Sequence, residues 1–489
     1  MLLAILLVGL SLRIYQLDAE SLWLDEAYTV DYMAYAGNSL LEVLRMSLPD
    51  QNPPLYYVLL HYWMWLFGDS EVSVRLPSVL FGILSVGLIY KVGYTLFDKQ
   101  TGLIASLILA LSAYQVHYAQ EARTYSMTVF WGLTSFYLFL RFFEGRDYRV
   151  LAGYVLSNAA LMYSHYYGLF LVAAQALFVL GYYVFRRRED EAPALRTWAW
   201  AAGAMTVLYI PGFFYLAYSL SHSENSNWIE TPGLSTLYSS FLEYAGAPNL
   251  GSSELLAVLI LFALVGVGVL AKKGGERAAL SLLSLWLIVP IALPFVLSQV
   301  LDPLYHPRYA IAALPALYLL VAVGMQRVGS VAMRATANRL GRLAAVAVTG
   351  VLFSLVGFLF FGALHDYFTT VKKQPWREVA SYMNMYSRSS DNLVISDAYS
   401  TTSYDYYARK NDLPEATNVL DPGDAPYVES WVRGSERVWL LLSYVPAEQE
   451  NQFKEALKKA GFEVADHKIY NEGVAGPKMD LTLYQSGEG

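Results

Sequence analysis

Long apolar stretches separated by short polar loops dominate the first 370 residues. A transmembrane helix needs about 20 mostly apolar residues, and about eleven stretches approach that length. The stretches lie near residues 2–17, 76–97, 103–119, 124–143, 148–163, 167–185, 197–218, 252–270, 278–298, 308–324 and 343–362. The apolar segment 54–68 is shorter and rich in Tyr and Trp, which favours an interfacial or re-entrant helix. The pattern predicts a polytopic α-helical membrane protein with about eleven transmembrane helices.

The pattern changes after residue 370. Residues 391–398, 437–445 and 479–485 have the short apolar runs of strands, whereas 374–386 and 448–462 have the spacing of amphipathic helices. We therefore expect two domains. The membrane domain comprises residues 1–369, with a first outer loop at 18–75, and the soluble α/β domain comprises residues 370–489.

Composition agrees with a membrane protein and excludes several kinds of chemistry. Hydrophobic residues make up 56% of the chain and charged residues 15%, which is more apolar than a soluble protein. The formal net charge of −7 argues against a nucleic-acid partner. Because the chain contains no cysteine, a disulfide or a catalytic thiol is excluded, and a metal would need carboxylate, His or carbonyl ligands.

The basic loops predict the orientation of the chain in the membrane. Lys and Arg accumulate in short cytoplasmic loops, and the basic loops, such as RFFEGRDYR at 141–149, all fall on one side if the segment 54–68 does not cross. We therefore expect a cytoplasmic N-terminus in a cell membrane. The opposite, extracytoplasmic side then carries the C-terminal domain and the loops around residues 25, 121, 165 and 306.

These outer loops contain the candidate site residues. The adjacent carboxylates Asp25 and Glu26 could deprotonate a hydroxyl group or hold a divalent cation, or they could be ordinary solvated loop acids. Glu121 is also explained by the dipole of the helix that follows it, but Arg123 at the membrane edge is costly unless it is paired or binds a ligand.

Histidine and arginine occur in two further outer loops. His165 lies among tyrosines and could be a base, a metal ligand or simply an interfacial residue. His306 and Arg308 precede another helix, where a guanidinium group could bind a phosphate through two hydrogen bonds. Arg13 and Arg75 are instead expected to snorkel to the membrane surface. Taken together, the carboxylates, histidines and arginines on one face are suited to removing a hydroxyl proton while stabilising an anionic phosphate leaving group.

Three stretches in order carry a family resemblance: SLWLDEAYT at 21–29, NPPLYYV followed by RLPS within 52–78, and YAQEARTYSM at 118–127. Together with HPRY at 306–309, they resemble the GT-C membrane glycosyltransferases of the protein O-mannosyltransferase and lipid A aminoarabinose transferase type (glycosyltransferase family 39-like). The resemblance covers roughly residues 10–325 and depends on order and spacing.

The resemblance implies an inverting glycosyltransferase. Its donor would be a polyprenyl-phosphate sugar and its acceptor an extracytoplasmic hydroxyl group of a glycan, lipid or protein. By resemblance, Asp25 is the base, Glu26 and Glu121 are further catalytic carboxylates, and Arg308 contacts the donor phosphate. The other implied substrate-binding residues are Asn52, Arg123, Tyr125, His165 and His306. Many relatives have His at the position of Asn52. No cofactor is specified and metal dependence is left open; if a divalent cation takes part, Asp25 and Glu121 would hold it.

Two other functional classes fit the same composition. A transporter or lipid-linked sugar flippase would line its path with these charged residues, but transporters tend to show internal repeats and broken helices in matching halves, which this sequence lacks. A structural or binding protein that uses only its outer domain leaves the carboxylates at the membrane edge unexplained. Glycosyl transfer is therefore the favoured hypothesis, with the sugar and the acceptor left open.

Overall fold

The described part of the chain forms two compact units. The computed structural model describes residues 1–35, 39–48, 52–185, 193–221, 229–272, 276–334, 339–370, 373–396, 398–413, 418–420, 423–443, 445–471 and 478–487. The first unit, here called the membrane unit, contains residues 1–15, 36–68 and 73–367. The second, here called the C-terminal unit, contains residues 16–35, 69–72 and 368–489. Two segments from early in the sequence, residues 16–35 and 69–72, thus belong with the C-terminal unit.

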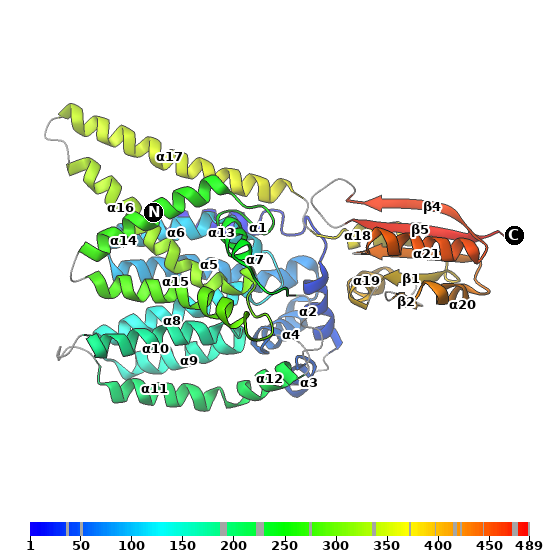
Figure 1. The fold of residues 1–489 in the computed structure, drawn as a ribbon, viewed down its shortest axis with the longest axis horizontal. Coiled ribbons are helices and arrows are strands. Elements are labelled where there is room, and N and C mark those ends of the chain that lie inside the picture. The colour runs from blue at the N-terminus through cyan, green and yellow to red at the C-terminus, as the bar shows by residue number, and fades with distance from the viewer. Residues whose placement is uncertain are drawn as a thin grey trace. The chain divides into compact units, whose positions relative to one another are not determined.

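Helices occupy the membrane unit throughout, and Figure 1 shows many of them running alongside one another. Their bounds are α1 (Leu2–Ile14), α3 (Leu40–Met46), α4 (Leu55–Phe67), α5 (Glu71–Leu96), α6 (Lys99–Leu111), α7 (Ala113–Ala119), α8 (Tyr125–Gly145), α9 (Tyr148–Ser164), α10 (Gly168–Phe185), α11 (Leu195–Leu208), α12 (Ile210–Ser221), α13 (Leu234–Ala245), α14 (Ser253–Lys272), α15 (Arg277–Leu297), the 3-10 helix η3 (Pro307–Ala313), α16 (Leu314–Arg334) and α17 (Arg339–Thr369).

The helices confirm a multi-pass membrane protein but not the predicted number of spans. Among the described residues, six helices are long and apolar enough to cross a membrane, or up to eight if each of two bent pairs counts as one span. Helices lie at all of the stretches predicted from the sequence, but several fall short in length or hydropathy; α1, for example, has 13 residues. The helix α4 also has 13 residues, which is too few for a span.

Close backbone packing joins α14 to α16. A Cβ atom on Gly324 would lie 1.9 Å from the carbonyl oxygen of Phe262, and one on Gly266 would lie 2.2 Å from that of Leu320. Small residues allow such close approach between membrane helices, where van der Waals contact replaces the hydrophobic effect as the driving force. These two glycines therefore fix where α14 and α16 cross.

Arg13 is buried, contrary to the prediction that it snorkels to the surface. Its guanidinium group donates hydrogen bonds to the carbonyl oxygens of Ala110 and Leu109, each at 3.2 Å. These carbonyls lie at the end of α6, where the chain bends by 62° into α7 and Ser112 caps the new helix through the amide of Gln115. A helix end leaves its last carbonyls without intrahelical partners, so Arg13 stabilises this bend. Arg75 is also buried, at 2% exposed.

The C-terminal unit contains a five-stranded sheet in the order β2-β1-β3-β5-β4. Its strands are β1 (Asn392–Ser396), β2 (Asn418–Leu420), β3 (Arg437–Ser443), β4 (Phe462–Tyr470) and β5 (Met479–Ser486). Its helices are α2 (Leu24–Tyr35), α18 (Trp376–Tyr386), α19 (Ala398–Asn411), α20 (Val428–Val432), α21 (Ala447–Lys459) and the 3-10 helix η4 (Ala425–Tyr427). The strands β1, β2 and β3 are parallel, whereas β5 is antiparallel to both β3 and β4. The α/β fold predicted here is confirmed.

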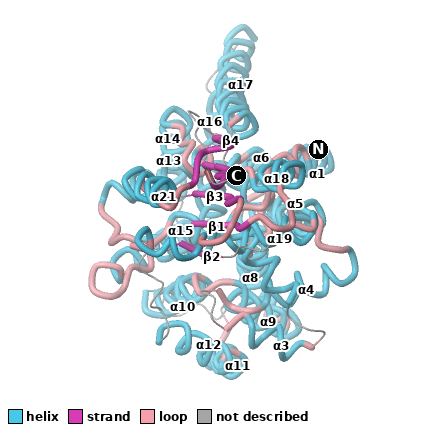
Figure 2. Tube along the Cα trace, turned by 90° about the vertical axis from the view of Figure 1, so that its right-hand side faces the viewer, coloured by secondary structure: helices cyan, strands magenta, loops and turns pink. Residues whose placement is uncertain are grey.

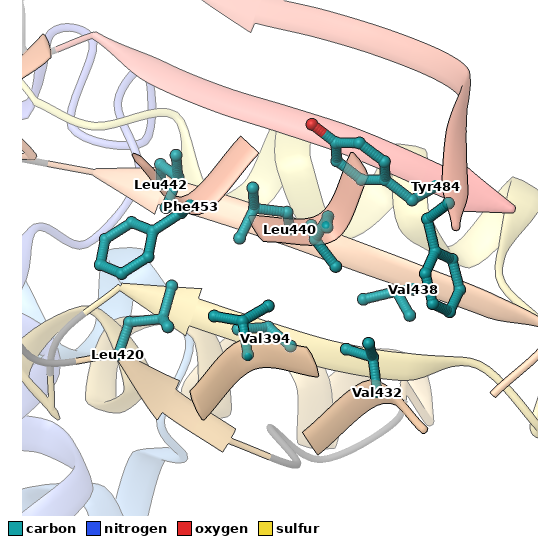
Figure 3. Packing of buried hydrophobic residues seen from close by; sticks show 11 residues of the cluster. Val394, Leu420, Val432, Val438, Leu440, Leu442, Phe453 and Tyr484 are labelled. Atoms are coloured by element: carbon teal, nitrogen blue, oxygen red, sulfur yellow. The ribbon is translucent and has the colours of Figure 1, made fainter. Parts of the chain in front are cut away.

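Apolar side chains at alternate positions of the strands form the core of this unit. Val438, Leu440 and Leu442 of β3 point to one face, where they pack with Phe453 of α21 and Val432 of α20. Figure 3 shows these side chains together with their neighbours from β1, β2 and β5. Figure 2 shows the strands between α21 on one side and α18 and α19 on the other. The sheet is therefore covered on both faces, as parallel strands require.

Candidate functional site

The bend between α6 and α7 positions the first pair of candidate groups. His117, in the last turn of α7, and Glu121 are four residues apart, and their Nε2 and Oε1 atoms lie 3.0 Å apart. Both side chains are buried, with exposed fractions of 7% for His117 and 1% for Glu121. Within the described residues, His117 Nδ1 and Glu121 Oε2 have no hydrogen-bond partner. Buried polar atoms are normally satisfied, so this pair has capacity for a ligand.

Gln120 lies between these two residues in the sequence, and its side chain forms hydrogen bonds to residues at the ends of two other helices. Its Nε2 atom donates to the carbonyl oxygen of Tyr15 at 2.7 Å, and its Oε1 atom accepts from the hydroxyl group of Tyr367 at 2.6 Å. Tyr15 follows α1, and Tyr367 lies in the last turn of α17. The segment that carries Glu121 is therefore held from both sides.

The start of α8 is fixed by hydrogen bonds to its backbone. Ser78 donates to the carbonyl oxygen of Arg123 at 3.1 Å, and Thr124 donates to the carbonyl oxygen of Ser164 at 2.7 Å. The second bond brings the turn that contains His165 next to α8, where the rings of Tyr125 and His165 lie 6.0 Å apart. Both aromatic side chains are buried.

His165 is a neutral group beside two positive charges. Its Nδ1 atom accepts a hydrogen bond from the amide of Tyr167 at 3.1 Å, and its Nε2 atom has no partner among the described residues. Burial, together with the nearby positive charges of Arg123 and Arg308, lowers the pKa of His165 to about 3. The imidazole is therefore uncharged at physiological pH, and it can offer a hydrogen bond but no positive charge.

The 3-10 helix η3 brings Arg308 to the same place. The side chain of His306 caps this helix by accepting from the amide of Arg308. The guanidinium carbon of Arg308 lies 5.8 Å from the ring centre of Tyr125 and 5.6 Å from that of Tyr309, within the range of cation–π contacts. Tyr309 also lies 4.9 Å from the ring of His165.

The helix α13 covers part of this cluster, which the sequence analysis did not anticipate. The hydroxyl group of Tyr244 donates to the carbonyl oxygen of Pro307 at 3.0 Å, and its ring lies 5.2 Å from that of Tyr114 on α7. Burial raises the pKa of the neighbouring Glu243 to about 7. The apolar residues of α13 recur every three or four positions, and this periodicity could have predicted the helix.

The membrane unit thus brings together most of the predicted site residues, here called the polar cluster. The ring of Tyr118 lies 4.8 Å from those of both His117 and Tyr125, which joins the His117–Glu121 pair to the other residues. The members of the cluster are His117, Glu121, Arg123, Tyr125, His165, His306 and Arg308. His117 was missed from the sequence, although its spacing of four residues from Glu121 on a helix was a usable signal. Asn52, also in this unit, is buried just before α4 at 6% exposed.

Asp25 and Glu26 belong to the C-terminal unit. Both lie in the first turn of α2, but their surroundings differ. Glu26 is fully buried, and its Oε2 atom lies 2.8 Å from Nζ of Lys373. Asp25 is partly exposed, and its carbonyl oxygen accepts from Thr29. The acid pair seen in the sequence is therefore two carboxylates in different environments.

The described residues contain no group of three or more His, Asp or Glu side chains that could hold a metal ion. His117 and Glu121 provide two ligand types that suit a divalent cation. A cation bound by this pair would need further ligands from water or substrate, as Mg²⁺ commonly uses.

Known proteins resemble this chain in part of its sequence and in its fold. Residues 51–214 match the family model of dolichyl-phosphate-mannose-protein mannosyltransferases. No curated protein matches the chain in sequence.

Solved structures share the fold along nearly the whole chain. ArnT from Cupriavidus metallidurans is 14% identical with a TM-score of 0.63, and the match covers 98% of this chain and 97% of ArnT. ArnT has also been solved with undecaprenyl phosphate. The oligosaccharyltransferase AglB from Archaeoglobus fulgidus is 12% identical with a TM-score of 0.58, covering 90% of this chain and 68% of AglB. The chain therefore has the fold of the GT-C membrane glycosyltransferases and resembles their protein mannosyltransferase family in sequence over residues 51–214.

Proposed function

We propose that the protein is an inverting glycosyltransferase that moves a sugar from a polyprenyl-phosphate donor to an acceptor hydroxyl group on the extracytoplasmic side of the membrane. The observation that carries this proposal is the polar cluster of the membrane unit, whose members are buried except for the partly exposed His306 and Arg308. It contains a carboxylate paired with a histidine and two arginines beside a neutral histidine. Positive charge held among buried side chains is suited to an anionic phosphate group.

The reaction needs a base and a stabilised leaving group. The acceptor hydroxyl oxygen attacks the anomeric carbon while the bond from that carbon to the phosphate oxygen breaks, and the electron pair leaves with the phosphate. The lipid phosphate diester thereby becomes a phosphate monoester, so protonation by a general acid is not required. Arg308 and Arg123 stabilise the negative charge that develops on the phosphate, because one guanidinium group can donate two parallel hydrogen bonds to two phosphate oxygens.

The base in this proposal is Asp25, assigned from the family resemblance. Asp25 is partly exposed, whereas the neighbouring Glu26 is fully buried. Glu121 has a second role: His117 holds Oε1, and Oε2 is then available for a substrate hydroxyl group or a divalent cation. His165 and Tyr125 line the same cluster and contact the donor headgroup through hydrogen bonding and ring packing.

The test is sugar transfer by purified protein. The protein in detergent is incubated with a panel of synthetic polyprenyl-phosphate sugars and soluble hydroxyl acceptors, and mass spectrometry follows free polyprenyl phosphate and glycosylated acceptor. Because a well-placed base contributes 10²- to 10⁴-fold, Asp25→Asn should lower the rate by about that factor. The matched control is Asp18→Asn, an exposed acid of the same loop, which should leave the rate unchanged.

Two outcomes contradict the proposal. An active Asp25→Asn protein removes the assignment of the base. Movement of the intact lipid-linked sugar across a vesicle membrane, with no release of polyprenyl phosphate, indicates a flippase instead. Adding a chelator to the same reaction decides whether a divalent cation takes part.

A further inference from the structure

The helix that carries Asp25 is built into the C-terminal unit. Although α2 lies near the start of the chain, it packs on α19, and residues 16–35 form one compact unit with residues 368–489. Within this unit, the loop before α2 and its first turn are held by several side chains from the C-terminal part. These contacts decide how the first turn of α2 is oriented.

A buried ion pair holds the first turn itself. Glu26 Oε2 lies 2.8 Å from Lys373 Nζ, and the two side chains are 0% and 8% exposed. The same oxygen faces the amide of Trp23 at 3.5 Å, and the carbonyl oxygen of Lys373 accepts from Asn471 at 3.3 Å. Burying two charges is costly unless they are paired, so neither side chain can turn away without breaking a buried ion pair.

A second set of hydrogen bonds holds the loop that leads into α2. Arg377 donates to the carbonyl oxygens of Asp18 at 2.9 Å and Ala19 at 3.2 Å. The amide of Leu22 donates to the hydroxyl group of Tyr407 at 2.7 Å. The entry to α2 is therefore fixed by α18 and α19, independently of the ion pair.

We propose that Glu26 is a positioning residue, through which Lys373 fixes the first turn of α2 and with it the direction of the Asp25 carboxylate. Adjacent residues on a helix point about 100° apart. Because Glu26 points into the C-terminal unit toward Lys373, Asp25 points to a different side. This inference rests on the proposed function only in that it takes Asp25 as the base.

Combining substitutions at both ends of the ion pair separates positioning from direct catalysis. Lys373→Met and Glu26→Gln each remove one charge of this buried ion pair, so the helix start shifts. A misplacement of about 1 Å can cost 10²-fold in rate, and we expect each variant to lower kcat by roughly 10- to 100-fold with little change in the donor KM. The double variant Glu26→Leu/Lys373→Met removes both charges. Replacing a buried ion pair by apolar residues is often neutral or stabilising, so kcat should return to within about 3-fold of the original.

The matched control is Arg433→Met, which removes an exposed ion pair with Glu429 in the same unit and should leave kcat unchanged. Thermal unfolding of each variant in detergent checks that the fold is retained. If Glu26 touches substrate instead, the double variant stays inactive while Lys373→Met alone remains active. That result would overturn the positioning role.

A readout that does not depend on activity keeps this inference separate from the proposed function. Hydrogen exchange of the α2 backbone amides should be faster in Lys373→Met and return toward the original rate in the double variant. Unchanged exchange in Lys373→Met overturns the inference even if transfer is observed. An active Asp25→Asn protein with the expected exchange pattern overturns the assignment of the base and leaves the positioning of α2 standing.

Discussion

His117 and Glu121 offer the sharpest test of the polar cluster, because the two side chains form a single buried pair. A hydrogen bond that involves a charged group contributes about 1.5–3 kcal/mol. Removing the donor with His117→Ala should therefore cost roughly 10- to 150-fold in kcat/KM. Removing the carboxylate charge with Glu121→Gln should cost more, about 10²- to 10⁴-fold, if Glu121 contacts the substrate or a cation.

The double variant His117→Ala/Glu121→Gln shows whether His117 acts through Glu121. If it does, His117→Ala should cost nothing further in the Glu121→Gln protein, since the interaction is already lost. His117→Gln should keep much of the activity, because its amide nitrogen can donate from nearly the place of Nε2. The exposed Glu254 in the first turn of α14 provides the control Glu254→Gln.

The assay measures polyprenyl phosphate released from the donor that the original protein accepts, at several donor concentrations. The reasoning is refuted if the two single losses multiply in the double variant, since His117 and Glu121 would then act independently. It is equally refuted if His117→Ala is as active as the original protein. Thermal unfolding of the same samples distinguishes lost activity from lost fold.

Three further predictions concern binding and stability. If the proposed donor site is present, Arg308→Met should weaken binding of a polyprenyl phosphate by roughly 10- to 150-fold. Ligand-induced thermal stabilisation measures this, and equal binding contradicts a phosphate contact. His165 takes up a proton more readily in the unfolded than in the folded protein, so the free energy of unfolding should fall as the pH drops from about 6.5 toward 3. In a His165→Gln protein the unfolding temperature should depend less on pH. Parallel pH profiles of the two proteins contradict this. Gly324→Ala places a methyl group against the carbonyl oxygen of Phe262 and should lower the unfolding temperature. Gly268→Ala, whose methyl group would lie in open space, should not. Equal shifts in the two variants would contradict the close crossing of α14 and α16.

The sequence predicts the helices well because each depends on a local property, the length of an apolar run. In the C-terminal unit, α18 and α21 were predicted from another local property, the spacing of apolar residues along one helix face. In contrast, β4 was missed because it is an edge strand whose residues are mostly exposed, so it lacks an alternating apolar signal. The polar helix α19 has no such signal either.

Partners that lie far away in the sequence limit what can be predicted about the site. Glu26 pairs with a lysine 347 positions later, and nothing near Glu26 distinguishes it from Asp25. Arg13 lies near the end of an apolar stretch, as a snorkelling side chain does, but it donates hydrogen bonds to carbonyl groups about 97 positions away. The sequence could therefore predict which residue types gather on one side, but not which of them are paired.

Release of polyprenyl phosphate by the purified protein tests the central claim most directly. The account predicts that one of the polyprenyl-phosphate sugars yields free polyprenyl phosphate and an equal amount of glycosylated acceptor, with inverted configuration at the anomeric carbon. Asp25→Asn and Glu121→Gln should lose this activity while they keep their unfolding temperature. Transfer with retained configuration, or full activity in either variant, would contradict the account.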